Sequence, residues 1–360
     1  MRGKEWPVLI LAAALLASSC IYTGKSKTYA SLLEKGTTRE IQDTLAGTIR
    51  SNAEIIRELQ RGPAKDWLRF VVVGDSVSKR NREYKDLLAS IAALDPPPAF
   101  VVNLGDFTRD APEHFSFYFE TIVGYPLPIL HVMGNHEAQY PAEMFFRAVF
   151  GTRDFFFDYG DTRFIFMGSE KLGFTRNRLD WLEDTLKDDV PAKKIFVSHE
   201  FMLEAYKEVL HGIVLSFVER IKGTDKVLEL LDRYDVPLAM AGHMHRYYEK
   251  IYRGTVMVVS GGGGQHAFFE PKAKQPLSTK KAHFTTIDLP TGPGQTLRLA
   301  ITAMDRGGKP LFPTSFYRWG TDGDNGGPSM QPMPYAALED DPTVPSYVRN
   351  LRQRSSRKVD

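Results

Sequence analysis

Five short apolar runs in the sequence each end in polar residues whose side chains can bind metal ions. Because ligands collect beyond the carboxyl ends of the strands in an α/β sheet, we expect these clusters to converge in space. They bring together Asp, Asn and His side chains, a donor set that suits a divalent metal ion when no thiolate is available. In chain order the clusters are Gly74-Asp75-Ser76, Gly105-Asp106, Gly134-Asn135-His136-Glu137, Ser198-His199-Glu200 and Gly242-His243-Met244-His245.

None of these clusters is strong evidence by itself. An aspartate after a strand often caps the following helix, and a lone histidine is more often a buried core residue than a ligand. The pair His243 and His245 is more specific, because histidines two residues apart point to neighbouring sites. The prediction of a metal site therefore rests on all five clusters, each directly after an apolar run.

The order of the motifs resembles that of the calcineurin-like metallophosphoesterase superfamily: D-x-H, G-D, G-N-H-[DE], a lone His and G-H-x-H. The resemblance covers residues 67–312. It implies an α/β fold of the four-layer α/β/β/α sandwich type and two divalent metal ions, with manganese, iron and zinc all open. It assigns Asp106 to both ions, Asp75 and His245 to the first ion, and Asn135, His199 and His243 to the second.

The resemblance also implies hydrolysis of a small-molecule phosphate ester, with Asp106 and His136 as the catalytic residues. His136 would lie beside the scissile phosphate as proton donor or charge stabiliser. Two cations about 3.5–4 Å apart can share a hydroxide, lower its pKa and clamp the phosphate oxygens, so that the bridging hydroxide attacks phosphorus in line. No covalent phosphoenzyme is needed. This agrees with the lack of a P-loop, since Gly261–Gly264 is not followed by Lys-Ser or Lys-Thr.

One departure from the family pattern affects the first metal ion. The family usually has a second ligand, a histidine, two residues after the first aspartate, where this chain has Val77. Arg109 stands where the purple acid phosphatase branch has its tyrosine. We therefore expect weaker binding at the first position. Two alternatives stay open: a catalytically weak binding protein with the same fold, and a phosphodiesterase or nucleotidase instead of a monoesterase.

Several other residues could lie near such a site. Ser76 could contact the first ion, although capping of the following turn is the simpler role, and Tyr247 and Tyr248 could stack on a substrate. Arg109 and Asp110 could reach a phosphate, and His211 and His266 could line a pocket. We assign no role to His114, His131 and His283.

The elements that must position these residues follow from the hydrophobic pattern. Short apolar runs alternate with amphipathic segments, which predicts strands buried on both faces with helices between them. Helical spacing is seen at Tyr84, Leu87, Leu88 and Ile91, and no repeat of 20–50 residues is present. The runs predicted as strands are Phe70–Val73, Phe100–Leu104, Ile129–Met133, Phe164–Met167, Ile195–Val197, Leu238–Ala241 and Val256–Val259.

Composition excludes several classes of protein. The 360 residues are 42% hydrophobic and 25% charged, which is typical of globular chains. The 46 basic and 44 acidic residues nearly cancel, so we expect no nucleic-acid polymer as partner. Cys20 is the only cysteine, which excludes an intramolecular disulfide and a cysteine-based zinc site.

The first twenty residues have the layout of an export signal. Arg2 and Lys4 precede the apolar run Val8–Ala17, which is too short to span a bilayer comfortably. Cys20 at its end resembles the lipidated cysteine of bacterial lipoproteins. We therefore expect a signal peptide over residues 1–19, a lipid anchor on Cys20, and a membrane-anchored protein on the periplasmic or extracellular side. An ordinary cleaved signal and an uncleaved anchor are the alternatives.

Two segments flank the predicted catalytic domain of residues 67–312. Residues 21–66 carry a helical stripe at Ile41, Leu45, Ile49, Ile56 and Leu59, and we expect a helix that lies on the domain or spaces it from the membrane. Residues 313–360 are rich in Gly and Pro and end in basic residues. For them we expect a solvated, disordered tail, with a weak contact to anionic lipid as a further option.

Overall fold

The computed structural model describes residues 38–45, 47–76, 82–108, 112–170, 173–200, 222–264, 278–320, 329–339 and 341–351. The predicted signal peptide and Cys20 lie outside these residues, as do Val77, Arg109, Asp110, His211 and His266. Within the described ranges, no helix combines the length and the apolar character needed to cross a membrane.

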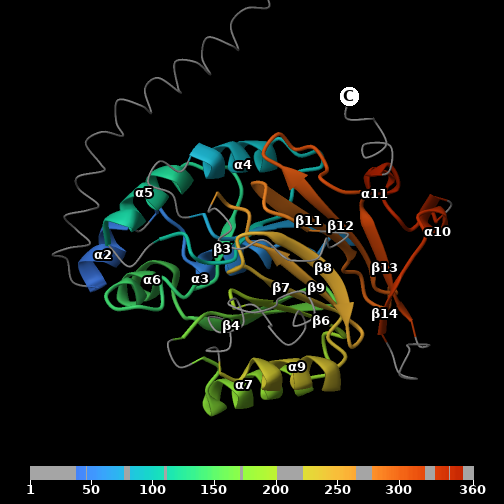
Figure 1. The fold of residues 1–360 in the computed structure, drawn as a ribbon. Coiled ribbons are helices and arrows are strands. Elements are labelled where there is room, and N and C mark those ends of the chain that lie inside the picture. The colour runs from blue at the N-terminus through green and yellow to red at the C-terminus, as the bar shows by residue number, and fades with distance from the viewer. Residues whose placement is uncertain are drawn as a thin grey trace, which may run out of the picture.

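Two seven-stranded sheets form the centre of the molecule (Figure 1). The first has the order β14-β13-β12-β11-β1-β2-β3, in which β1, β2 and β3 are parallel and the other pairs antiparallel. Its strands are β1 (Trp67–Val73), β2 (Val101–Asn103), β3 (Ile129–His131), β11 (His283–Pro290), β12 (Arg298–Asp305), β13 (Ser315–Gly320) and β14 (Ser329–Pro332).

The second sheet has the order β10-β8-β9-β7-β6-β5-β4. Its inner strands β5, β6, β7 and β9 are parallel, and β4, β8 and β10 pair antiparallel. The strands are β4 (Asp154–Tyr159), β5 (Thr162–Met167), β6 (Lys193–Ser198), β7 (Leu238–Ala241), β8 (Tyr247–Tyr252), β9 (Thr255–Ser260) and β10 (Ser278–Thr279).

Helices cover the outer faces of both sheets. In Figure 1, α4 and α5 lie along one side of the molecule and α7 and α9 along the opposite side. The first group of helices comprises α2 (Thr38–Leu45), α3 (Asn52–Leu59), α4 (Arg82–Ala92), α5 (Pro112–Ile122) and α6 (Ala142–Phe150), the second α7 (Arg176–Lys187) and α9 (Thr224–Arg233), and α10 (Ala336–Glu339) and α11 (Ser346–Arg349) follow near the end of the chain.

The side chains of β1 point alternately into the two layers that cover the strand. Phe70 and Val72 belong to the core between the two sheets, whereas Val71 and Val73 pack with α4, α5 and α6. Successive side chains of a strand point to opposite faces, so a strand of apolar residues must be covered on both sides. A third core lies between the second sheet and helices α7 and α9. These four layers confirm the predicted α/β/β/α sandwich.

The chain beyond residue 312 differs from the expected tail. Strands β13 and β14 extend the first sheet, and Val348 and Leu351 are 0% and 2% exposed in a core with Trp67. Apolar side chains among the Gly and Pro residues are buried against the first sheet. The composition of the segment, rich in Gly and Pro, did not reveal this packing. The prediction of a disordered tail is therefore wrong for residues 313–320, 329–339 and 341–351.

Where the structure describes the segment before residue 67, in residues 38–45 and 47–66, it shows two helices, α2 and α3. A capping box at Ser51 and Glu54 starts α3, because each residue bonds the backbone N–H of the other. Leu45, Ile49 and Ile55 are buried against the domain, so this segment packs on the fold.

Candidate metal centre

The predicted site residues follow the carboxyl ends of parallel strands from both sheets. Asp75 follows β1, Asp106 follows β2, His199 follows β6 and His243 follows β7. Because the strands of each parallel set run in one direction, their carboxyl ends lie at the same edge. The sequence clusters are therefore brought to one rim of the sandwich.

Four site residues adopt left-handed backbone conformations that are uncommon outside glycine. The φ angles are 59° at Asp75, 54° at Asp106, 70° at His243 and 48° at His245. Such conformations cost free energy and persist where the surrounding structure enforces them, often at functional sites. Their concentration in these loops indicates that the loops are shaped to aim side chains.

Asp106, Asn135, His199 and His243 form one compact group of donor atoms. His199 Nε2 lies 3.3 Å from Asp106 Oδ2, 2.9 Å from Asn135 Oδ1 and 3.2 Å from His243 Nδ1. His243 Nδ1 lies 2.8 Å from Asn135 Oδ1. The other ring nitrogen of His199, Nδ1, is 2.8 Å from the Leu104 carbonyl oxygen, which orients the imidazole.

Asp75 and His245 form a neighbouring pair. His245 Nε2 lies 3.5 Å from Asp75 Oδ1, and Asp75 Oδ2 accepts a hydrogen bond of 2.9 Å from the His243 backbone N–H. The bond to His243 joins this pair to the first group. Asp75 is fully buried, yet its Oδ1 has no hydrogen-bond partner among the described residues.

His136 lies at the exposed side of the same group. Its backbone N–H donates to Asp106 Oδ1 at 3.0 Å, and its Nε2 is 3.8 Å from Asp106 Oδ2. The His136 side chain is 28% exposed, whereas that of Asp106 is 2% exposed. Of the two, His136 is the residue that a molecule arriving from solvent can reach.

The sequence model of the family described as calcineurin-like phosphoesterase matches residues 68–247, which are 180 of the 360 residues. The chain belongs to the calcineurin-like phosphoesterase family. The matched range ends at β8 and contains all seven predicted site residues.

Curated relatives of this chain include two proteins of Arabidopsis thaliana. Probable inactive purple acid phosphatase 24 is 24% identical over 264 residues, which cover 65% of this chain and 39% of that protein. Probable inactive purple acid phosphatase 27 is 22% identical over 253 residues, which cover 65% and 40%. The chain thus spans about two fifths of the length of these relatives.

Solved structures of similar fold include GAP50, the anchor in the inner membrane complex of Plasmodium. It matches with a TM-score of 0.52 and 15% identity, over 69% of this chain and 88% of that chain. PhoD matches with a TM-score of 0.50 and 9% identity, over 76% and 73%. At these identities the likeness shows the shared fold alone.

The donor set of this chain fits a divalent metal ion. The ligand atoms of Asp106, His199 and His243 all lie within 4.8 Å of one another. The Oδ1 of buried Asp75, which accepts no hydrogen bond from the described residues, is a second indication, because a buried carboxylate oxygen needs a compensating partner. Carboxylate, amide and imidazole donors accept manganese, iron or zinc, and nothing in the donor set selects one of them.

Burial and opposite charges set the ionisation of the group. Burial would raise the pKa of Asp106, but the neighbouring His199 and His136 hold it well below its usual range. Burial would lower the pKa of His199, but the Asp106 carboxylate raises it to about 10. Burial raises the pKa of Asp75 and lowers that of His243. A cation at this place would therefore compete with a proton on His199.

Glu137 is a residue of this site to which the sequence assigned no role. It is fully buried and accepts hydrogen bonds of 2.8 Å from the backbone N–H groups of Gly134, Asp106 and Thr108, and from the Thr108 hydroxyl. Glu137 thereby joins the loops after β2 and β3. In the sequence, only its place as the last residue of the motif G-N-H-E indicated that Glu137 belongs to the site.

Glycines allow the close approach of these loops. A Cβ on Gly134 would lie 2.2 Å from Asp106 Oδ1, and one on Gly261 would lie 2.6 Å from Asp75 Oδ2. Neither position has room for a side chain. The run Gly261–Gly264 therefore begins beside the site.

Other residues singled out in the sequence are buried. Tyr247 and Tyr248 are 1% and 3% exposed, so they pack in the core and do not offer a stacking surface. His131 and His283 are also buried. Ser76 is fully buried, and its Oγ has no hydrogen-bond partner among the described residues.

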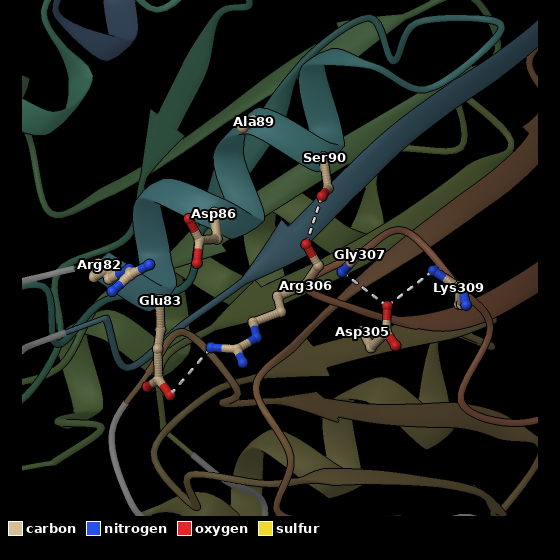
Figure 2. Close-up of a pocket in the computed structure, with 9 residues that line it drawn as sticks. All are labelled: Arg82, Glu83, Asp86, Ala89, Ser90, Asp305, Arg306, Gly307 and Lys309. Atoms are coloured by element: carbon tan, nitrogen blue, oxygen red, sulfur yellow. Dashed lines mark hydrogen bonds and ion pairs between the residues drawn. The ribbon is translucent and has the colours of Figure 1, made fainter.

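A separate cavity of about 900 Å³ opens between α4 and the turn after β12 (Figure 2). Charges of both signs line it, and the Arg306 guanidinium lies 4.0 Å from the Glu83 carboxylate. A Cβ on Gly264 would lie 3.4 Å from the Glu83 side chain, so the cavity adjoins the end of the glycine run. It contains none of the seven predicted site residues. This cavity is therefore lined largely by charged residues and is distinct from the candidate metal centre.

Proposed function

We propose that this phosphoesterase hydrolyses a phosphate ester with water at a centre of two divalent metal ions. The observation that carries the proposal is that His199 Nε2 lies within 2.9–3.3 Å of donor atoms of Asp106, Asn135 and His243. Membership of the family supports a phosphate ester as substrate.

The two groups of donors suggest how the ions would be shared. Asp106 would contact both ions, Asp75 and His245 would hold the first, and Asn135, His199 and His243 the second. When bound, such ions lower the pKa of water and offset the negative charge of the phosphate. The chain itself fixes the donors in place through the hydrogen bonds from the His243 and His136 backbones to the two aspartates.

His136 is the group that would act on the substrate. Its exposed ring beside Asp106 is placed to donate a proton to the leaving oxygen, or to stabilise charge that develops there. Its Nε2 lies 3.8 Å from Asp106 Oδ2, so this ring nitrogen is next to the carboxylate that would hold the metal ions.

Purified residues 22–360 can be tested on p-nitrophenyl phosphate and bis(p-nitrophenyl) phosphate, with added Mn²⁺ and with a chelator. We expect turnover that disappears with chelator and returns with Mn²⁺. The ratio of the two rates separates a monoesterase from a diesterase. A folded protein that is inactive on both esters with every metal tested would contradict the proposal.

That inactive outcome would favour the second candidate, a protein that keeps the fold to bind a partner or phosphorylated ligand. Two observations keep this candidate in view: both curated relatives are named inactive, and Val77 replaces a usual ligand.

We also propose that the protein is exported and anchored through a lipid on Cys20. The support is the sequence of residues 1–20, in which a short positive region and an apolar run precede the only cysteine. Mass spectrometry of the processed N-terminus after bacterial expression tests this. An acylated Cys20 is the expected result, and an unmodified N-terminus after another cleavage site would contradict it.

A further inference from the structure

The loop that carries Asp106 needs support from outside itself. Gly105 and Asp106 have φ angles of 95° and 54°, so two successive residues are left-handed. For Asp106 this conformation costs free energy, which neighbouring contacts must offset. Glu137 holds the loop from one side by accepting the Asp106 N–H.

Asn103 holds the loop from the other side. The Gly105 N–H donates to Asn103 Oδ1 at 3.0 Å, directly before Asp106. Asn103 is the last residue of β2 and is fully buried, so its side chain is fixed by protein groups instead of by water. The main chain of β2 and the side chain of Asn103 thus define where the turn to Asp106 begins.

Two phenols set the orientation of the Asn103 amide. Its Nδ2 donates to the Tyr84 hydroxyl at 3.0 Å and to the Tyr118 hydroxyl at 2.9 Å. With both amide protons used in this way, the oxygen must face Gly105. Tyr84 lies on α4 and Tyr118 on α5, so the amide connects the outer helix layer to the metal centre.

His131 completes the chain of hydrogen bonds. The Tyr118 hydroxyl lies 2.9 Å from His131 Nε2, and the imidazole stacks on Phe150 with ring centres 3.8 Å apart. Burial lowers the pKa of His131 to about 3, so its ring is neutral, and Nε2 accepts a hydrogen bond from the Tyr118 hydroxyl in the tautomer that carries its proton on Nδ1. Hydrogen bonds therefore connect His131 through Tyr118 and Asn103 to the backbone of Gly105.

We infer that Asn103 is a positioning residue of the metal centre, which, oriented by Tyr84, Tyr118 and His131, fixes the turn that aims Asp106. Asn103 lies outside the family's motifs and contacts none of the predicted ligand atoms. Its effect passes through the backbone of Gly105. The inference rests on the proposed function in one respect, because the measurement of metal affinity requires that the centre binds metal.

The test compares three variants of the purified protein. Asn103→Ala removes the acceptor for Gly105, and Asn103→Asp keeps it. Asn52→Ala is the matched control, because Asn52 is also buried and makes two side-chain hydrogen bonds, at 2.8 and 2.9 Å, to the backbone of His131. Both alanine variants lose a buried side-chain amide. The Asn103 amide makes one hydrogen bond to backbone and the Asn52 amide makes two, but only Asn103 bonds the loop that carries Asp106.

Two readouts are independent of turnover. Amide hydrogen exchange of metal-free protein, read on peptides that cover residues 101–108, should rise at least tenfold for Gly105 in Asn103→Ala. Mn²⁺ affinity, measured by electron paramagnetic resonance of free Mn²⁺, should fall roughly 10–100-fold, as is usual for outer groups that orient ligands. Asn103→Asp should stay near wild type in both, and Asn52→Ala should lower only the melting temperature.

Equal exchange and equal Mn²⁺ affinity in Asn103→Ala and Asn52→Ala would overturn the inference. If Asn103→Ala does not fold, loss of protection at Gly105 in Asn103→Asp would overturn it, and retained protection would support it. A wild-type protein that binds none of Mn²⁺, Fe²⁺ and Zn²⁺ would contradict the proposed function, while the exchange comparison would still decide the role of Asn103.

Discussion

Asp106 is in contact with Glu137, His136 and His199. Its N–H bonds to Glu137, its Oδ1 accepts from the His136 backbone, and its Oδ2 faces the imidazoles of His199 and His136. The residue is nearly fully buried, so these contacts decide both its charge and its direction. His136 differs, because it meets solvent and can change partners during a reaction.

This difference between buried ligands and an exposed histidine predicts the behaviour of His136→Gln. Turnover of p-nitrophenyl phosphate should fall about 10²–10⁴-fold, because the proton donor is lost. Metal content, measured by elemental analysis, should stay unchanged, since none of the predicted ligands is altered. His114→Gln, on the partly exposed face of α5, is the control and should keep wild-type turnover. Full activity of His136→Gln would show that the assigned role is wrong.

At the scale of elements, the last part of the chain packs on the first sheet. The Trp67 indole N–H donates to the Thr343 carbonyl at 2.8 Å, and Arg298 of β12 pairs with Asp341. Leu338 of α10 is 2% exposed within the same core as Trp67. These contacts cover a face of β1 and β12 that a detached tail would leave in water.

Leu338→Ala should therefore destabilise the whole domain. Removing a buried leucine side chain costs about 2–5 kcal/mol of unfolding free energy, because transfer energy is lost and a cavity remains. The exposed neighbouring variant Ala337→Ser should change stability by less than about 0.5 kcal/mol. Urea denaturation measures both. A Leu338→Ala protein as stable as wild type would mean that this segment does not belong to the folded domain.

At the scale of the whole molecule, buried histidines link stability to pH. Burial lowers the pKa of His131 to about 3 and that of His283 to about 4, so both are neutral in the folded protein. The unfolded chain binds a proton on each near pH 6.5. Since the unfolded state then holds more protons, stability falls as pH drops from about 6.5 towards the folded-state pKa values.

A comparison of wild type with His131→Gln isolates this effect. Between pH 7.5 and 4.5, wild type should lose on the order of 2–3 kcal/mol more unfolding free energy than the variant. The comparison with the variant is needed because burial raises the pKa values of Asp75 and Glu137. These two carboxyl groups make the folded protein more stable as pH drops, in wild type and variant alike, so their effect cancels in the difference. Urea titrations at the two pH values give the comparison. Parallel pH profiles would show that His131 is not the group responsible.

The sequence by itself determined the parts of this protein that depend on local pattern. Apolar runs such as Phe70–Val73 and Ile195–Val197 must be strands of a covered sheet, since their side chains are apolar on both faces. Asp75, Asp106 and His199 follow such runs, and parallel strands bring their ends together, so the order of motifs sufficed to predict where they meet.

Only the tertiary structure decided what depends on partners far apart in the chain. Strands β13 and β14 exist because they pair with β12 and each other, and their Gly- and Pro-rich surroundings conceal that pairing. Asn103 and Glu137 hold the Asp106 loop through hydrogen bonds whose geometry no spacing in the sequence encodes. Local periodicity reports which face of a segment is buried, whereas hydrogen bonds between loops form only after the sheets have packed.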